Sequence, residues 1–119
     1  MKKTVIAFDC DGTLIQNGAL NDHEIVANEQ IRTLLIILAR FKNVKIIVWS
    51  GGGELWARQV GAALGLDRYV WKYMSKNHVA TTKTMPPVHI FKPEIKPDIA
   101  IDDIQGCELG IMNLIVREK

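Results

Sequence analysis

The sequence predicts an α/β fold built on a mostly parallel five-stranded sheet. Short apolar runs alternate with amphipathic stretches of helical period, a pattern typical of parallel strands joined by helices on both faces of a sheet. Three of the apolar runs end in chemically useful residues, at Asp9, Ser50 and Asp102. Because right-handed crossovers bring the carboxyl ends of parallel strands to one edge, these residues are expected to lie close together. The predicted architecture is a single Rossmann-like, doubly wound domain over residues 1–119.

Composition restricts the class of protein. A chain of 119 residues with 48% apolar and 24% charged residues is ordinary for one soluble globular domain. The net charge of +2 is too small to predict a nucleic-acid or membrane surface. No apolar stretch reaches the ~18–20 residues of a membrane span, and the first apolar run, which ends at Asp9, is unlike a secretory signal. Cys10 and Cys107 suggest neither a disulfide framework nor a zinc site, so a cytoplasmic protein is expected.

The first half of the chain is expected to alternate strand and helix. Residues 4–8 and 44–49 are apolar runs typical of strands buried on both faces. Residues 29–41 and 54–64 have the helical period, and Gly65 is placed to end the second helix. In the first predicted helix the inward-facing residues are expected to be Ile31, Leu34, Leu35, Leu38 and Phe41, and Ile36 and Ile37 widen this apolar face. In the second they are expected to be Leu55, Trp56, Val60 and Leu64.

The remaining segments are shorter and less regular. Residues 16–28 are polar and rich in turn residues, which suits a flap rather than a domain. Residues 69–74 predict a third strand, and residues 76–97, with the Pro86-Pro87 pair, predict an irregular loop. Residues 99–101 and 113–116 predict the fourth and fifth strands, separated by a short crossing.

The first strand ends in the sequence V-I-A-F-D-C-D-G-T, from Val5 to Thr13. Gly12 allows a sharp turn and Thr13 can bond locally to hold it. Asp9 and Asp11 then lie at the carboxyl end of a buried strand, where two acids repel each other unless a cation or a shared proton relieves them. Such a pair suits Mg²⁺, which prefers oxygen ligands. The simpler alternative is two solvated acids at an Asp-Gly turn.

Two further strand ends carry polar motifs. Ser50 is followed by Gly51, Gly52 and Gly53 and then by a helix, which is the outline of a phosphate-binding turn at a helix amino terminus, although a flexible glycine turn is the alternative. The 99–101 strand ends in Asp102 and Asp103. Since burial penalises carboxylates, two adjacent acids do not suit an ordinary hydrophobic core. The alternative interpretation is that they are polar residues at the end of the strand that cap the next segment.

Together these motifs resemble those of the haloacid dehalogenase superfamily. The first motif of its phosphatases is D-x-D-G-T, as at Asp9 to Thr13, and the second is an apolar strand that closes on Ser or Thr, as at Ser50. The fourth ends an apolar strand in two acids, as at Asp102 and Asp103. The resemblance extends over nearly the whole chain, and implies a single small hydrolase domain of this superfamily without a cap domain.

The resemblance also implies roles for these residues. Asp9 is the nucleophile that forms an aspartyl-phosphate, and Asp11 is the general acid and base. Mg²⁺ is held by the Asp9 carboxylate, the Asp11 backbone carbonyl and the Asp103 carboxylate. The remaining roles are phosphate binding for Ser50, Gly51 and Gly52, and support of the ligands for Asp102 and Thr13. Glu108 is a weaker expectation, as a residue that binds a water on the metal.

The third motif of the superfamily supplies a lysine, and the sequence leaves its identity open. Lys76 follows the predicted third strand at its carboxyl end and is therefore preferred. Lys92 and Lys96 are rivals, since they are nearer to Asp102 in the sequence. The full set of candidates is Lys72, Lys76, Lys83, Lys92 and Lys96.

The predicted function is a Mg²⁺-dependent phosphohydrolase (phosphatase) acting on phosphate monoesters. A phosphotransferase that uses the same residues, and a non-catalytic regulatory protein that only binds phosphate, are the alternatives. Without a cap, an open site admits a bulky phosphorylated partner, such as a nucleic-acid end or a protein, as well as a small phosphate ester. Trp49 and Trp56 are assigned to the core rather than to stacking on bases.

Overall fold

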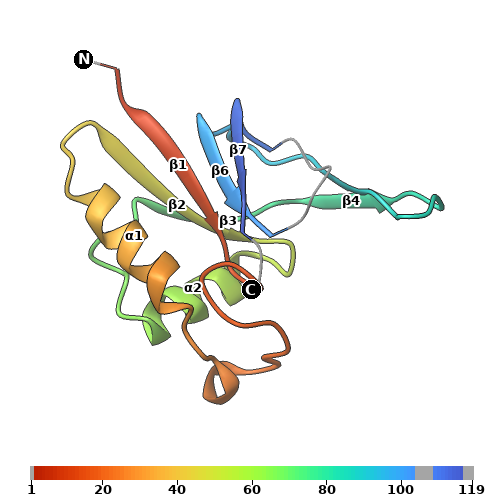
Figure 1. Ribbon diagram of the computed structural model, residues 1–119, viewed down its shortest axis with the longest axis horizontal. Coiled ribbons are helices and arrows are strands. Elements are labelled where there is room, and N and C mark those ends of the chain that lie inside the picture. Colours follow the sequence, from red (N-terminus) through yellow and green to blue (C-terminus); the bar gives the residue numbers. More distant parts are fainter. Residues whose placement is uncertain (1, 104–108, 117–119) are drawn as a thin grey trace.

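The computed structural model describes residues 2–103 and 109–116, and shows an α/β fold of Rossmann-like type (Figure 1). Its five-stranded sheet is entirely parallel, with strand order β3-β2-β1-β6-β7. The sheet strands are β1 (Thr4–Asp9), β2 (Val44–Ser50), β3 (Lys72–Ser75), β6 (Ile99–Asp102) and β7 (Met112–Ile115). The other elements are the helices α1 (Glu29–Ala39) and α2 (Glu54–Ala63), a short 3-10 helix η1 (Asp22–Glu24), and the hairpin strands β4 (His78–Thr81) and β5 (His89–Phe91).

The direction of winding reverses beside β1. From β1 the chain proceeds outward through β2 to β3, then returns to place β6 on the other side of β1 and β7 beyond it. Open α/β sheets bind ligands outside the carboxyl ends of the strands at such a switch point. In this chain β1 and β6 flank that point, and they end at Asp9 and Asp102.

Both helices cover the same face of the sheet, which corrects the expectation of helices on both faces for the described part of the chain (Figure 1). Alternate strand residues divide the core into two layers. The layer beneath the helices includes Ile6, Phe8, Ile46, Val48, Leu35 and Val60. The opposite layer is formed by Ala7, Ile47, Trp49, Met74, Ala100 and Leu109, with Phe91 and Ile95 packed against it.

The crossover from β3 to β6 contains a hairpin and, in these described residues, no helix. All four prolines of the chain lie in residues 86–97, and proline removes a helical hydrogen bond and clashes with the preceding turn. The prediction that residues 76–97 are irregular was wrong for β4 and β5, which pair antiparallel with His78 opposite Phe91 and Thr81 opposite His89. Two short strands in a proline-rich segment give too weak a periodic signal to be recognised locally.

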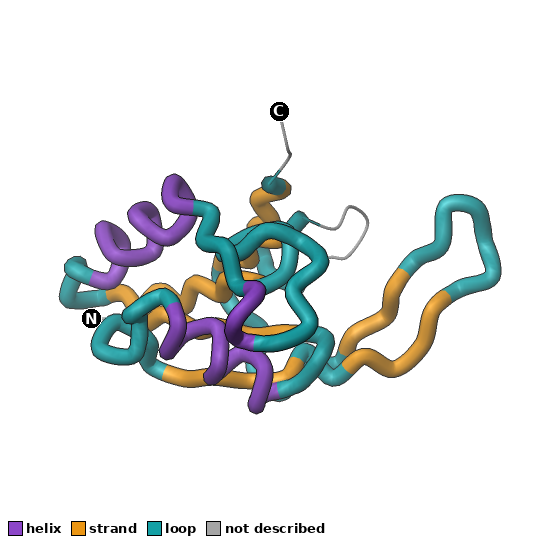
Figure 2. Tube along the Cα trace, turned by 90° about the horizontal axis from the view of Figure 1, so that it is seen from below, coloured by secondary structure: helices purple, strands orange, loops and turns teal. Residues whose placement is uncertain are grey.

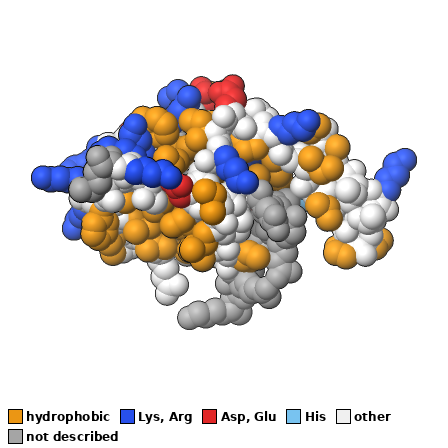
Figure 3. All heavy atoms as spheres, turned by 90° about the horizontal axis from the view of Figure 1, so that it is seen from above, with side chains coloured by type: hydrophobic (Ala, Val, Ile, Leu, Met, Phe, Trp, Pro, Cys, Tyr) orange, Lys and Arg blue, Asp and Glu red, His pale blue; other side chains and the backbone are white. Residues whose placement is uncertain are grey.

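The hairpin projects away from the sheet (Figure 2). In Figure 3 it forms the lobe at the right, with hydrophobic side chains on its surface. Val79 and Met85 are the most exposed of them, at 55% and 92%.

The predicted helices and strands are otherwise close to those observed. The third strand begins at Lys72 rather than at residue 69, because Tyr69 lies in a turn and donates its N–H to the Leu66 carbonyl. Gly65 ends α2 with φ +69°, as predicted. The predicted inward orientation was wrong for three apolar residues, because the side chains of Ile37, Phe41 and Leu55 are exposed.

No helix in residues 2–103 and 109–116 has the length and apolar character needed to cross a membrane.

Candidate active site at the switch point

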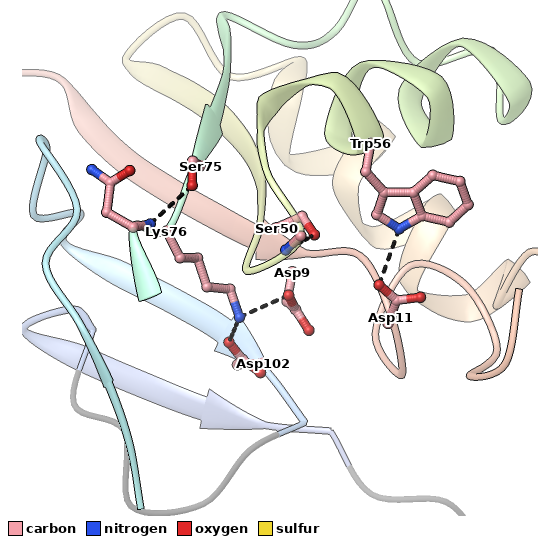
Figure 4. A network of polar contacts seen from close by, with 9 residues as sticks. Asp9, Asp11, Ser50, Trp56, Ser75, Lys76 and Asp102 are labelled. Carbon is pink, nitrogen blue, oxygen red and sulfur yellow. Dashed lines mark hydrogen bonds and ion pairs between the residues drawn. The ribbon is translucent and has the colours of Figure 1, made fainter. Parts of the chain in front are cut away.

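A buried lysine joins two carboxylates at the carboxyl edge of the sheet. The Lys76 Nζ lies 2.8 Å from Asp9 Oδ1 and 2.6 Å from Asp102 Oδ2 (Figure 4). The three side chains are 2%, 7% and 7% exposed, respectively. Lys76 directly follows β3, whereas Asp9 ends β1, with β2 between them. Since neighbouring strands are ~4.8 Å apart, a contact across β2 requires a side chain with the long flexible stem of lysine.

The five candidate lysines differ in burial. Lys72, Lys83, Lys92 and Lys96 are exposed, and Lys76 alone of the five is buried. The Phe91 ring, from the hairpin, lies 5.0 Å from the Lys76 Nζ and contributes a cation–π contact.

A third carboxylate, that of Asp103, completes an acidic cluster with Asp9 and Asp102. One oxygen from each of the three lies within 4.8 Å of the others. Asp103 packs directly against Gly12, where a Cβ would lie 2.0 Å from Asp103 Oδ2. Gly12 also has φ +78°, a conformation that favours glycine. The D-G-T turn therefore leaves room for an acid from the end of β6.

The charges in this cluster do not balance. When all three acids are ionised, the single Lys76 ammonium leaves an excess of two negative charges. Burial raises the pKa of Asp9 well above its ordinary value, with further contributions from Asp102 and Asp103 and an opposing one from Lys76. The pKa of Asp103 is also raised, by burial and by its contacts with Asp102. Burial alone would lower the pKa of Lys76, but the two carboxylates raise it, so the ammonium stays charged.

This donor set fits a divalent cation. Three hard oxygen donors lie within 4.8 Å of one another, and a charge of +2 would cancel the excess negative charge. Asp103 is half-buried, so the cluster is not sealed from solvent. The acidic cluster could therefore hold a metal ion, and Asp102 lies inside the cluster while it also binds Lys76.

The Asp11 side chain points away from this cluster. Its Oδ2 accepts a hydrogen bond of 3.1 Å from the indole Nε1 of Trp56, in the first turn of α2 (Figure 4). The backbone between Asp9 and Ile15 forms a tight loop, in which the N–H groups of Thr13 and Ile15 both donate to the Cys10 carbonyl. Thr13 is fully buried, and its Oγ1 has no hydrogen-bond partner among the described residues. Burial raises the pKa of the Cys10 thiol well above its ordinary value, which leaves it unreactive.

The predicted phosphate-binding turn borders the same edge. Ser50 is buried at the end of β2, and its Oγ accepts a 2.9 Å hydrogen bond from the Gly52 N–H. The Ser50 carbonyl accepts from the Lys76 N–H at 3.0 Å, which ties this turn to the lysine. A Cβ at Gly51 would lie 3.3 Å from the Phe91 ring, so the hairpin also borders the turn. Gly53, with φ +110°, is the N-cap residue directly before α2.

Sequence reasoning missed two residues at this site. Trp56 packs partly against the core, as expected, but its indole N–H also binds Asp11. Phe91 fell in a segment predicted to be irregular, and only the paired hairpin brings it over Lys76. Trp49 is fully buried, as predicted. The predictions for Glu108 and Cys107 fall outside the described residues.

Comparisons of the chain with protein-family models, with curated proteins and with solved structures found no match.

Proposed function

We propose that this chain is a Mg²⁺-dependent phosphohydrolase of haloacid dehalogenase type, which cleaves phosphate monoesters through an aspartyl-phosphate. The observation that carries the proposal is the buried Lys76, bound to both Asp9 and Asp102 at the switch point of the sheet. A buried cation between two strand-end acids stabilises an ionised nucleophile and attracts an anionic substrate.

Asp9 is proposed as the nucleophile. Lys76 binds its Oδ1, which orients the carboxylate and leaves Oδ2 for attack on phosphorus. In this step an Asp9 oxygen forms a bond to phosphorus, and the bond from phosphorus to the ester oxygen breaks. The Lys76 ammonium also reduces the repulsion between the Asp9 carboxylate and the phosphoryl oxygens.

Asp11 is proposed to move the protons. Protonated Asp11 gives its proton to the departing ester oxygen, and the resulting carboxylate then accepts a proton from a water that attacks the aspartyl-phosphate. Hydrolysis releases inorganic phosphate, restores the Asp9 carboxylate and leaves Asp11 protonated for the next cycle. Asp11, the first residue of the D-G-T turn, is half-buried, so water can reach its carboxyl group.

Ser50 and its glycine turn are proposed to bind the phosphoryl oxygens. Because Ser50 Oγ already accepts a hydrogen bond from the Gly52 N–H, its own proton is free to point at a phosphate. Gly51 brings a further backbone N–H to the amino terminus of α2. Gly52 then contributes by orienting Ser50.

The carboxylates of Asp9 and Asp103 would hold Mg²⁺ together with the Asp11 carbonyl, while Asp102 orients Lys76. When bound, Mg²⁺ supplies charge neutralisation between the carboxylates and the transferring phosphoryl group.

We propose that the substrate is a phosphate monoester with a large organic part. A groove of about 730 Å³ lies beside Gly12, and its lining includes the polar residues Asn17, Asn28 and Gln30 and the apolar residues Ile15 and Ile31. This groove offers room for a part of the substrate beyond the phosphate, such as a nucleic-acid end or a phosphorylated protein segment.

A screen of phosphate esters with Mg²⁺, comparing the native chain with Asp9→Asn, tests the proposal. Phosphate release by the native chain that is lost in Asp9→Asn is the expected result. Asp98→Asn is a matched control, because Asp98 Oδ2 only accepts from the Val5 N–H at the opposite edge of the sheet. Absence of release by the native chain, or equal release by Asp9→Asn, would reject the phosphatase. Addition of alcohol acceptors separates hydrolysis from phosphotransfer by the products formed.

A further inference from the structure

We infer that Trp56 is a positioning residue for Asp11, and that it determines which Asp11 oxygen carries the transferred proton. This inference rests on the proposed phosphatase activity and deepens it. Its basis is the 3.1 Å hydrogen bond from the Trp56 indole N–H to Asp11 Oδ2, drawn in Figure 4.

Trp56 is held by the fold in a way that suits this role. It lies in the first turn of α2, which begins directly after the Ser50 turn. Its ring packs partly against the helix-covered core, and its Cδ1 would lie 3.8 Å from a Cβ at Gly52. The indole is partly buried, and its N–H reaches out of α2 to the loop that follows β1.

The chemistry of the indole fixes the roles of the two carboxyl oxygens. An indole N–H can only donate a hydrogen bond, so Asp11 Oδ2 must remain an acceptor in both protonation states. Because the carbonyl oxygen of a carboxylic acid is the stronger acceptor, this hydrogen bond favours the form of neutral Asp11 that carries its proton on Oδ1. In the proposed first step the Oδ1–H bond breaks and an O–H bond to the departing ester oxygen forms, and in the second step Oδ1 takes a proton from water.

A purely structural role makes a different prediction. If Trp56 only tied α2 to the 9–15 loop, its loss would slow all substrates alike. If it orients the acid, its loss lowers kcat/KM most for esters whose leaving oxygen needs a proton.

The experiment compares Trp56→Phe with the native chain on two esters, in the presence of Mg²⁺. On an alkyl phosphate, whose leaving group requires protonation, kcat/KM, which reports the steps up to release of the leaving group, is expected to fall about tenfold or more, as loss of a hydrogen bond to the carboxylate formed at Asp11 implies. On p-nitrophenyl phosphate, whose leaving group needs little protonation, the expected fall is less than about threefold. Trp71→Phe is the matched control, because Trp71 lies against Lys45 before β3 begins, at the other edge of the sheet.

A double-mutant cycle shows whether the effect passes through Asp11. In an Asp11→Asn background, Trp56→Phe is expected to change kcat/KM for the alkyl phosphate by less than about twofold, since the acid is already absent. Trp56→Leu also lacks the N–H and is expected to give the same pattern, so the test survives if one variant fails to fold. Equal losses on both esters, or a full loss that persists with Asp11→Asn, would overturn the inference while leaving the phosphatase intact. An inactive native chain would overturn both.

Discussion

The Asp103 carboxylate occupies the space that a side chain at residue 12 would fill. A Cβ on Gly12 would lie 2.0 Å from Asp103 Oδ2 and 2.6 Å from its Cγ. This close approach joins the D-G-T turn after β1 to the end of β6, so the two halves of the proposed metal site are fitted to each other.

Gly12→Ala is therefore expected to displace Asp103 and to weaken Mg²⁺ binding at least tenfold. Gly18→Ala is the matched control, because Gly18 also has a positive φ (+101°) but nothing lies within 4 Å of its Cβ position. Both variants carry the backbone cost of about 1 kcal/mol for alanine at positive φ, and only Gly12→Ala should lose the metal. Titration calorimetry with Mg²⁺ and thermal unfolding measure the two effects. Equal Mg²⁺ affinity in the two variants would contradict the proposed site.

Lys76→Met is expected to abolish turnover and to reduce the free energy of unfolding by roughly 3–5 kcal/mol, since it leaves Asp9 and Asp102 buried without their cation. Excess Mg²⁺ should recover part of this stability but not the activity. Lys72→Met provides the control, because Lys72 is exposed and two strands away from β1. Denaturant unfolding with and without Mg²⁺ measures the difference, and native-like stability of Lys76→Met in the absence of metal would show that the ion pairs contribute little.

The stability of the metal-free protein is expected to fall as pH rises. The pKa of folded Asp9 is raised by burial, whereas that of an unfolded aspartate is about 3.9. Between these two values the unfolded chain loses its proton while the folded chain keeps it, so the free energy of unfolding decreases from about pH 4 upward until the raised pKa is passed. Asp103 acts in the same direction, and Lys76 stays charged throughout this window.

Asp9→Asn should flatten this dependence and raise the midpoint of thermal unfolding at neutral pH without Mg²⁺. Thermal unfolding between pH 4 and pH 8 measures it, with Asp98→Asn as the control that keeps the native slope. If Asp9→Asn kept the pH dependence of the native chain, burial of the Asp9 carboxyl could not be its cause.

Substrate size provides a separate test. The groove beside Gly12 predicts that kcat/KM for a phosphate-ended oligonucleotide or a phosphopeptide exceeds that for a mononucleotide by tenfold or more. Steady-state kinetics on the three substrates checks this expectation. A strong preference for one small metabolite would contradict it.

The sequence by itself determined the sheet strands, the two helices and the residues at the strand ends. These features depend on local properties, namely apolar periodicity and the turn preferences of glycine, which act within a few residues. The topology of parallel strands then brought Asp9, Asp102 and Lys76 to one edge, and the position of Lys76 directly after the third strand was enough to prefer it.

Only the tertiary structure decided the contacts that join distant segments. Both helices lie on one face because the chain winds in one direction from β1 to β3, and the proline-rich return path forms a hairpin instead of a helix. The Trp56–Asp11 hydrogen bond and the Gly12–Asp103 contact span 45 and 91 residues of sequence. They depend on the reach and direction of individual side chains across packed strands, a property that hydrophobic periodicity does not encode.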